Sequence, residues 1–206
     1  AAKLLLPVAR ALEYAHQRGV LHRDVKPANI LITEEGDPLL SDFGIAKMLE
    51  DEHTIQLTGT GTGIGTPEYM PPEQWTGKAV PQTDVYALGI VFYELITGRR
   101  PYTADTPAAI LIKHINDPLP RPKIFVPELP DVVEKVLFKA LAKHLDDRYE
   151  SMAQFAKALE QLIVVRTQPS TQDDLPTLHA SQQLVELRIK VEKTLGEGDW
   201  TGAYRL

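Results

Sequence analysis

The sequence predicts a mainly α-helical fold with one short β-hairpin, followed by a linker and a helical tail. Three observations support this class of fold. Apolar residues recur at helical spacing in several segments, two short apolar runs flank a turn-forming hexapeptide, and the composition turns polar after residue 165. With 43% hydrophobic and 24% charged residues among 206, the chain can bury one sizeable core with an appendage.

The first helix is predicted near the start of the chain. Leu4, Val8, Leu12 and Ala15 fall on one face of a helix, because residues three and four positions apart are neighbours on a helical surface. Gly19 follows and can adopt the positive φ that ends a helix. We expect this helix to begin without a capping side chain.

A small β-hairpin is predicted next. The apolar runs Ile30–Ile32 and Leu39–Leu40 are separated by residues 33–38, which read Thr-Glu-Glu-Gly-Asp-Pro. These six residues have the composition of a turn between two short strands. The hairpin therefore follows the first helix directly.

The segment from Lys47 to Thr66 is predicted to lack regular structure. It is rich in Asp, Glu and Thr, and glycines stand at positions 59, 61, 63 and 65, a composition typical of loops. Long irregular stretches inside compact domains are uncommon and often functional. We therefore expect this segment to take part in function.

A buried central helix is predicted over residues 83–97. The segment is apolar nearly all round, as in a helix surrounded by core, and Gly98 with Pro101 ends it. Its most apolar part, residues 85–97, is too short to span a membrane and contains Glu94. We expect no membrane segment in this chain.

Three further helices are predicted downstream. The first spans about residues 107–115. The second begins where Asp131 and Glu134 stand at capping-box spacing, and the third begins where Ser151 and Gln154 have the same arrangement. The core is therefore expected to be helical.

The chain changes character after the predicted core. Residues 165–179 are too poor in apolar groups to pack, which predicts a linker between a domain of residues 1–164 and a tail of residues 180–206. The tail has apolar residues at helical spacing, and its end, EGDWTGAYRL, resembles part of a helical-repeat hairpin. We expect either the start of a helical repeat or a simple amphipathic linker helix.

The overall charge and the absence of cysteine limit the classes of partner. A net charge of -6 gives no general attraction for phosphate backbones, and no local basic patch is visible, so we expect no nucleic-acid partner. The chain has no cysteine, which fits a reducing compartment. A cytoplasmic location is expected, although a longer parent protein could be anchored in a membrane.

Three motifs carry the candidate chemistry. Residues 22–29 read HRDVKPAN, residues 42–44 read DFG, and residues 65–74 read GTPEYMPPEQ. In this order and spacing they resemble the catalytic loop, the magnesium-binding motif and the end of the activation segment of bacterial serine/threonine protein kinases related to the eukaryotic ones. The resemblance implies the large, C-terminal lobe of a protein kinase catalytic domain, with ATP and Mg²⁺ as cofactors and proteins as substrates.

Phosphoryl transfer from ATP needs a carboxylate that accepts the proton of the attacking hydroxyl, a cation near the moving phosphoryl group, and oxygen ligands for Mg²⁺. Asp24 is the candidate catalytic base and Lys26 the candidate cation. Asn29 and Asp42 are the candidate metal ligands, which the predicted hairpin would bring side by side. The resemblance implies that Lys26, Asn29, Leu31 and Asp42 contact the nucleotide.

The resemblance also assigns a role to the end of the activation segment. It implies that Thr66 bonds to Asp24 and Lys26 and shapes the platform for the protein substrate. One residue departs from the family pattern, because Pro71 stands where the family has alanine. Proline lacks a backbone donor but is tolerated near a helix start, so we expect only a local adjustment.

Structural roles are implied for five more residues. His22 would pack beneath Phe43, Glu73 would pair with Arg148, and Asp84 would hold the backbone of the catalytic loop. A metal-ligand role for His22 is the alternative, but the sequence has no second His or Cys at metal-ligand spacing.

A regulatory site is implied within the segment before Thr66. In the family, an arginine such as Arg23 binds a phosphate on the activation segment, and Thr58 and Thr60 are the candidate phosphorylation sites. A phosphothreonine can order a flexible loop through arginine pairing. The alternative is that these threonines are ordinary small polar loop residues.

The ATP-binding small lobe of a kinase has no counterpart in these residues. A glycine-rich phosphate loop, a strand lysine and its helix glutamate partner are missing, and GTGTG at residues 59–63 lies on the wrong side of the catalytic loop. We expect the N-terminal lobe to be absent and the isolated chain to be inactive, because the ATP phosphates would be poorly positioned.

Two other functional classes remain open. A pseudokinase-type binding module would keep the fold without catalysis, but Asp24, Lys26, Asn29 and Asp42 are all present. A small-molecule phosphotransferase of kinase-like fold would share the catalytic Asp and the downstream Asn and Asp. Such enzymes lack a platform of the GTPEYMPPEQ type.

Overall fold

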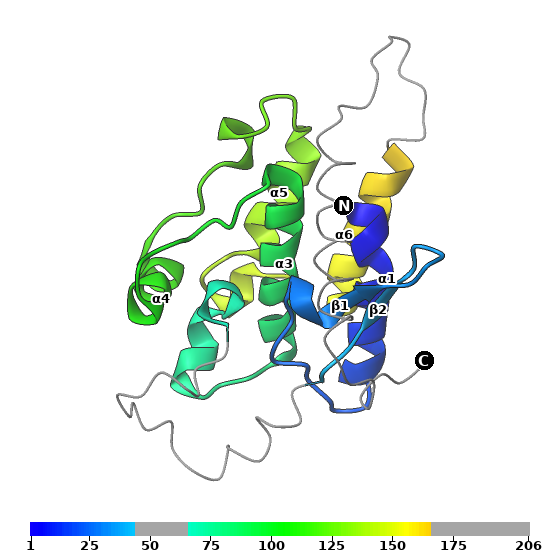
Figure 1. The fold of residues 1–206 in the computed structure, drawn as a ribbon, viewed down its shortest axis with the longest axis horizontal. Helices are drawn as coiled ribbons and strands as arrows, with labels where there is room; N and C mark the ends of the chain where they lie inside the picture. The colour runs from blue at the N-terminus through cyan, green and yellow to red at the C-terminus, as the bar shows by residue number, and fades with distance from the viewer. Residues whose placement is uncertain (44–65, 166–206) are drawn as a thin grey trace.

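A computed structural model describes residues 1–43 and 66–165 of the chain. In this part the fold is mainly helical with one two-stranded antiparallel sheet (Figure 1), which confirms the predicted class. The helices are α1 (Ala2–His16), α3 (Pro81–Thr97), α4 (Pro107–Asn116), α5 (Asp131–Ala140) and α6 (Met152–Val165), and the strands are β1 (Ile30–Ile32) and β2 (Pro38–Leu40).

Helix α3 forms the centre of the core. It packs against α1, α5 and α6, and α4 lies further out on the side away from α1 (Figure 1). Its tyrosines Tyr86 and Tyr93 are fully buried with Leu88 and Ile90, as predicted for a helix that is apolar all round. The helix begins at Pro81, slightly before the predicted start, and ends at Gly98, which has a φ of 73°.

Helix α1 lies along α6, and together they close one side of the core (Figure 1). Leu5 and Leu12 of α1 and Phe155 and Leu159 of α6 are fully buried. As predicted, no side chain caps the start of α1. The chain leaves α1 through Gly19, whose φ of 74° would be strained for a residue with a Cβ atom.

The predicted hairpin is confirmed. Ile30 pairs with Leu40, and Ile32 pairs with Pro38 at the end of the ladder, a position where the missing N–H of proline does not break the sheet. The hairpin packs against α1 through β2. It therefore fixes the residues immediately before β1 and after β2 relative to the core.

The predicted cap of α5 is wrong. Pro130 occupies the N-cap position and offers no side-chain acceptor. Asp131 is already inside the helix and binds Lys123, and Glu134 accepts hydrogen bonds from Arg121. Both carboxylates therefore pair with basic residues of the preceding segment rather than with the start of the helix.

The predicted cap of α6 is partly present. The Ser151 hydroxyl accepts a hydrogen bond from the amide of Gln154 at 3.3 Å. The Gln154 side-chain oxygen, however, accepts from the amide of Glu150 rather than from that of Ser151. The two residues thus interact at the start of α6, but the reciprocal bond is shifted by one residue.

Five short 3₁₀ turns within residues 1–43 and 66–165 were not predicted, because three to five residues carry too little periodicity to reveal a helix. They are η1 (Pro27–Asn29), η2 (Pro67–Tyr69), η3 (Pro72–Thr76), η4 (Pro122–Ile124) and η5 (Leu145–Asp147).

Several predictions fall on residues outside those described. They concern the segment from Lys47 to residue 65 with Thr58 and Thr60, the linker beyond residue 165, and the helical tail. Among the described residues, no helix is both long and apolar enough to cross a bilayer.

Candidate active site

The candidate catalytic loop lies between α1 and β1, and one buried carboxylate holds its backbone. Asp84, which is fully buried on α3, accepts hydrogen bonds from the amides of His22 and Arg23 at 2.8 Å each. His16 Nε2 lies 2.8 Å from Asp84 Oδ2. Arg23 has a φ of 63°, a left-handed conformation that costs roughly 1–2 kcal/mol for a residue with a Cβ atom. The bonds to Asp84 help to maintain this strained backbone.

The side chains of Asp24, Lys26, Asn29 and Thr66 converge on one site. Lys26 Nζ lies 2.8 Å from Asp24 Oδ2 and donates to Thr66 Oγ1 at 3.1 Å. Asn29 Nδ2 donates to the Asp24 carbonyl at 2.8 Å and to Asp24 Oδ2 at 3.3 Å. Asp24 and Lys26 remain 22% and 23% exposed, so both side chains are accessible to solvent.

Asp42 lies close to this site because Ser41 links it to Asn29. The Ser41 amide donates to the Asn29 carbonyl at 2.9 Å. The Ser41 hydroxyl lies 3.3 Å from that carbonyl and 3.3 Å from Asp42 Oδ2. Asp42 has a φ of 55° and an exposed side chain. Hairpin pairing therefore brings together the two residues that the sequence predicts as metal ligands.

The donor set at Asn29 and Asp42 fits Mg²⁺ in composition. The Asn29 amide nitrogen is directed at Asp24, which leaves its Oδ1 atom for a cation, and Asp42 supplies a carboxylate. Mg²⁺ takes oxygen ligands and usually keeps waters and phosphate oxygens for most of its octahedron. Within the described ranges, His, Cys, Asp and Glu side chains do not form a group of three that could hold a metal. Waters or the oxygens of a bound ligand would complete the shell.

His22 is buried and fully engaged. Its ring lies 4.8 Å from the ring of Phe43, its Nε2 atom lies 2.9 Å from the Ser41 carbonyl, and its Nδ1 atom accepts from the Asp24 amide at 3.3 Å. These partners require a proton on Nε2 and a lone pair on Nδ1. Both ring nitrogens are occupied, so the geometry favours the structural role of His22 over metal binding.

The residues after Thr66 form two short turns, η2 and η3. Pro71 is buried at the N-cap of η3 with a φ of -73°, a value that proline favours. Glu73 binds Arg148 through two hydrogen bonds of 2.7 and 2.9 Å.

Leu31, the remaining residue that the sequence predicts to contact the nucleotide, lies in the middle of β1, opposite Leu39, and is partly buried.

Sequence reasoning missed several contacts of this platform. Tyr69 donates its hydroxyl to Glu94 at 2.6 Å, and Glu68 pairs with Arg100 at 2.8 Å. Burial, and then the bond to Glu94, raise the pKa of Tyr69 well above its usual value, so the phenol stays protonated. The only sequence signal was Glu94 itself, a carboxylate inside the apolar central helix.

Helix α4 packs against η2 and η3. A polar cluster connects His114 of this helix with Tyr86, Tyr102 and Lys143. His114 is fully buried, and its Nδ1 atom lies 2.9 Å from the Tyr86 hydroxyl. Lys143 donates to the Tyr102 hydroxyl at 2.8 Å and to the His114 carbonyl. Burial, and then the Lys143 charge, lower the pKa of His114 to about 4. The cluster is therefore a neutral histidine beside a cation.

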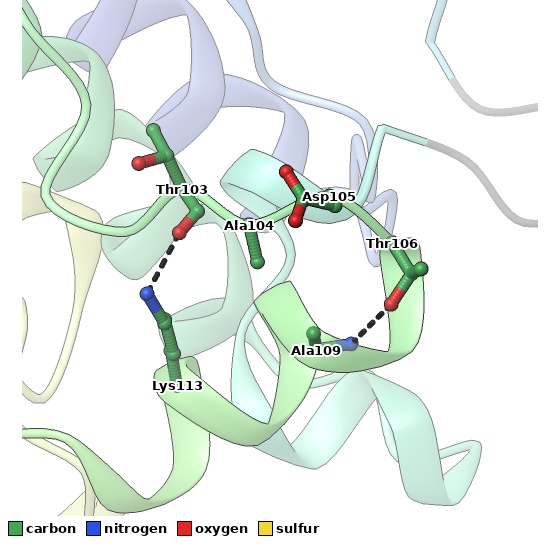
Figure 2. A pocket seen from close by; sticks show the side chains of 6 residues that line it. All are labelled: Thr103, Ala104, Asp105, Thr106, Ala109 and Lys113. Atoms are coloured by element: carbon green, nitrogen blue, oxygen red, sulfur yellow. Dashed lines mark hydrogen bonds between the residues drawn. The ribbon is translucent and has the colours of Figure 1, made fainter.

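A shallow pocket lies at the start of α4 (Figure 2). Two of its polar side chains, Lys113 and Thr106, have partners in the protein. Lys113 donates to the Thr103 carbonyl at 2.8 Å, and the Thr106 hydroxyl accepts from the amide of Ala109 at 3.2 Å. None of the predicted site residues lines this pocket, and we assign it no role.

The protein kinase domain model matches residues 1–163 of the chain. The chain therefore belongs to the protein kinase family. This match covers both the converging site and the platform that follows it.

The chain is similar to bacterial proteins named as serine/threonine kinases. It is 42% identical over 167 residues to the probable serine/threonine-protein kinase CE0033 of Corynebacterium efficiens, covering 79% of this chain and 25% of that protein. It is 43% identical over 168 residues to the probable serine/threonine-protein kinase PknB of Corynebacterium glutamicum, covering 79% and 26%. It is 40% identical over 164 residues to the serine/threonine-protein kinase PknH of Mycobacterium tuberculosis, covering 79% and 26%. The chain spans about a quarter of the length of these relatives.

Proposed function

We propose that this chain forms the C-terminal lobe of a serine/threonine protein kinase, which transfers the γ-phosphoryl group of ATP to Ser and Thr hydroxyls of proteins. The convergence of Asp24, Lys26, Asn29 and Thr66 carries the proposal. The names of the relatives support the serine/threonine class.

Asp24 orients the attacking hydroxyl and accepts its proton, since its carboxylate is partly exposed and held by two neighbours. Lys26 bridges Asp24 and Thr66, which places a cation where the phosphoryl group moves. Asn29 and Asp42 would hold Mg²⁺, which would neutralise charge on the phosphates when bound. Lys26, Asn29, Leu31 and Asp42 contact the nucleotide.

The organisation of the chain is part of this proposal. Residues 1–164 form the lobe, residues 165–179 a linker, and residues 180–206 a helical tail.

Thr58 and Thr60 are phosphorylated, and Arg23 binds the phosphate. A cytoplasmic location is part of the proposal, with a longer parent protein that could be anchored in a membrane; the need for ATP supports it, and the absence of cysteine fits a reducing compartment.

The 206 residues contain no glycine-rich loop or strand lysine upstream of the catalytic loop, so transfer requires an added ATP-binding lobe. Positioning of the phosphates accounts for orders of magnitude in rate. We expect no measurable transfer by the isolated chain.

The test joins the chain to an ATP-binding lobe from a relative and supplies Mg-ATP with a protein substrate or a small alcohol. The proposal predicts phosphoserine and phosphothreonine on the protein and loss of transfer when Mg²⁺ is chelated. Phosphate on the small alcohol alone would indicate a small-molecule phosphotransferase. Nucleotide binding without any transfer would indicate a binding module. Phosphorylation at Thr58 or Thr60 would be read from the same sample by mass spectrometry.

A further inference from the structure

The peptide group between Arg23 and Asp24 accepts a hydrogen bond that none of the three sequence motifs predicts. Gln74 Nε2 donates a hydrogen bond to the Arg23 carbonyl at 2.9 Å, across 51 positions of the chain. Gln74 is partly buried and lies in η3, directly after Glu73. The end of the substrate platform therefore reaches the residue before the candidate base.

This contact acts on a strained part of the backbone. Arg23 has a φ of 63°, and a residue with a Cβ atom keeps such a conformation only when surrounding contacts enforce it. Its amide is bound by Asp84 at 2.8 Å, and its carbonyl is bound by Gln74. Two separate elements, α3 and η3, thus hold the two polar backbone groups of one residue.

The two polar groups of the peptide between Arg23 and Asp24 make hydrogen bonds of different length. Its N–H group donates to His22 Nδ1 at 3.3 Å, a long hydrogen bond, whereas its carbonyl receives the shorter bond from Gln74. Without the Gln74 donor, this peptide loses the shorter of the two bonds. Rotation of the peptide would then change the direction of the Asp24 side chain.

We propose that Gln74 is a positioning residue for Asp24, which acts through the Arg23 carbonyl and couples a correctly folded substrate platform to the catalytic loop. This inference rests on the proposed kinase function. The proposal depends on the chemistry of the Gln74 side chain. The Arg23 carbonyl needs an N–H or O–H donor, and the uncharged glutamine amide provides an N–H group. A role of Gln74 only in folding would instead act on stability and on peptide binding.

The experiment compares three variants of the kinase that carries its ATP-binding lobe. Gln74→Met keeps the side-chain length without a donor, Gln74→Lys keeps a donor, and Gln154→Met makes the same change at an exposed position of α6. We expect Gln74→Met to slow single-turnover transfer about 10- to 100-fold, with KM for ATP and for peptide changed less than about 2-fold. Gln74→Lys should retain most of the rate, and Gln154→Met should retain all of it.

Hydrogen exchange provides a second readout that does not need activity. The amides of residues 22–26 should exchange faster in Gln74→Met than in the unchanged protein, whereas the amides of α3 should exchange at the same rate. An unchanged rate and exchange pattern in Gln74→Met would overturn the proposal, as would equal losses in the Met and Lys variants. An inactive unchanged protein would contradict the kinase function, and the exchange pattern would still decide the role of Gln74.

Discussion

Arg148 and Glu73 bind each other through two parallel hydrogen bonds of 2.7 and 2.9 Å across 75 positions of the chain. The Arg148 side chain is fully buried, and that of Glu73 is 8% exposed. The guanidinium group also donates to the carbonyls of Ala142 and Gln82. This pair ties the end of the candidate activation segment to the segment that precedes α6.

Removing one partner of this pair should destabilise the fold strongly. We expect Arg148→Met to lower the free energy of unfolding by about 3–5 kcal/mol, because it leaves the Glu73 carboxylate buried without its cation. Urea unfolding measures the change. The matched control is Arg10→Met, which breaks an ion pair whose side chains are 63% and 52% exposed and should cost less than about 1 kcal/mol. Equal losses in the two variants would contradict the prediction.

Thr66→Val tests the bond between the platform and Lys26. The change keeps the side-chain shape but removes the hydroxyl that accepts from Lys26 Nζ at 3.1 Å. We expect kcat to fall about 10-fold or more, since small displacements of catalytic groups are costly, and Thr66→Ser to retain most of it. A steady-state assay with a peptide substrate provides the comparison. Activity that is the same in the Val and Ser variants would count against a role of this hydroxyl.

Asp84→Asn tests how the catalytic loop is held. Asparagine has one acceptor oxygen where aspartate has two, so it cannot accept from the amides of His22 and Arg23 and also bind His16. We expect kcat to fall about 10- to 100-fold and hydrogen exchange of the loop amides to increase. Thr97→Val alters a buried polar position at the other end of α3, where the hydroxyl binds Tyr93 and Arg99 rather than the loop, and it should leave loop exchange unchanged. Slow loop exchange in Asp84→Asn would refute this account.

The buried histidine predicts a dependence of stability on pH. The pKa of His114 in the folded protein is lowered to about 4 by burial and by Lys143, whereas the unfolded chain binds a proton near pH 6.5. The unfolded state therefore takes up the proton first as the pH falls. The free energy of unfolding should therefore decrease as the pH falls from 6.5 toward 4. At pH 5 it should be about 2 kcal/mol lower than well above pH 6.5.

Urea unfolding at several pH values between 7 and 5 checks this expectation. His114→Gln removes the titrating group, so its stability should change less over this range. His144→Gln is the control, because His144 is exposed and should leave the dependence unchanged. The same dependence in His114→Gln and in the unchanged protein would show that other groups cause it.

The helices and the hairpin could be predicted because their apolar residues repeat at a fixed spacing. Asp24 and Asn29 could be found because they lie within one short motif. The contacts of His16 with Asp84 and of Gln74 with Arg23 join polar residues 68 and 51 positions apart, and no periodicity links such residues. The cap of α5 was misjudged because the spacing of Asp131 and Glu134 could not show that Pro130 precedes the helix as its N-cap.

The role of Asp24 is tested most directly by single-turnover transfer in Asp24→Asn, with the chain joined to an ATP-binding lobe. Asparagine keeps the size of the side chain but cannot accept the proton of the attacking hydroxyl at neutral pH. The account predicts a loss of about 100-fold or more in the transfer rate, with ATP affinity and the free energy of unfolding little changed. Transfer by Asp24→Asn at the rate of the unchanged protein would contradict it.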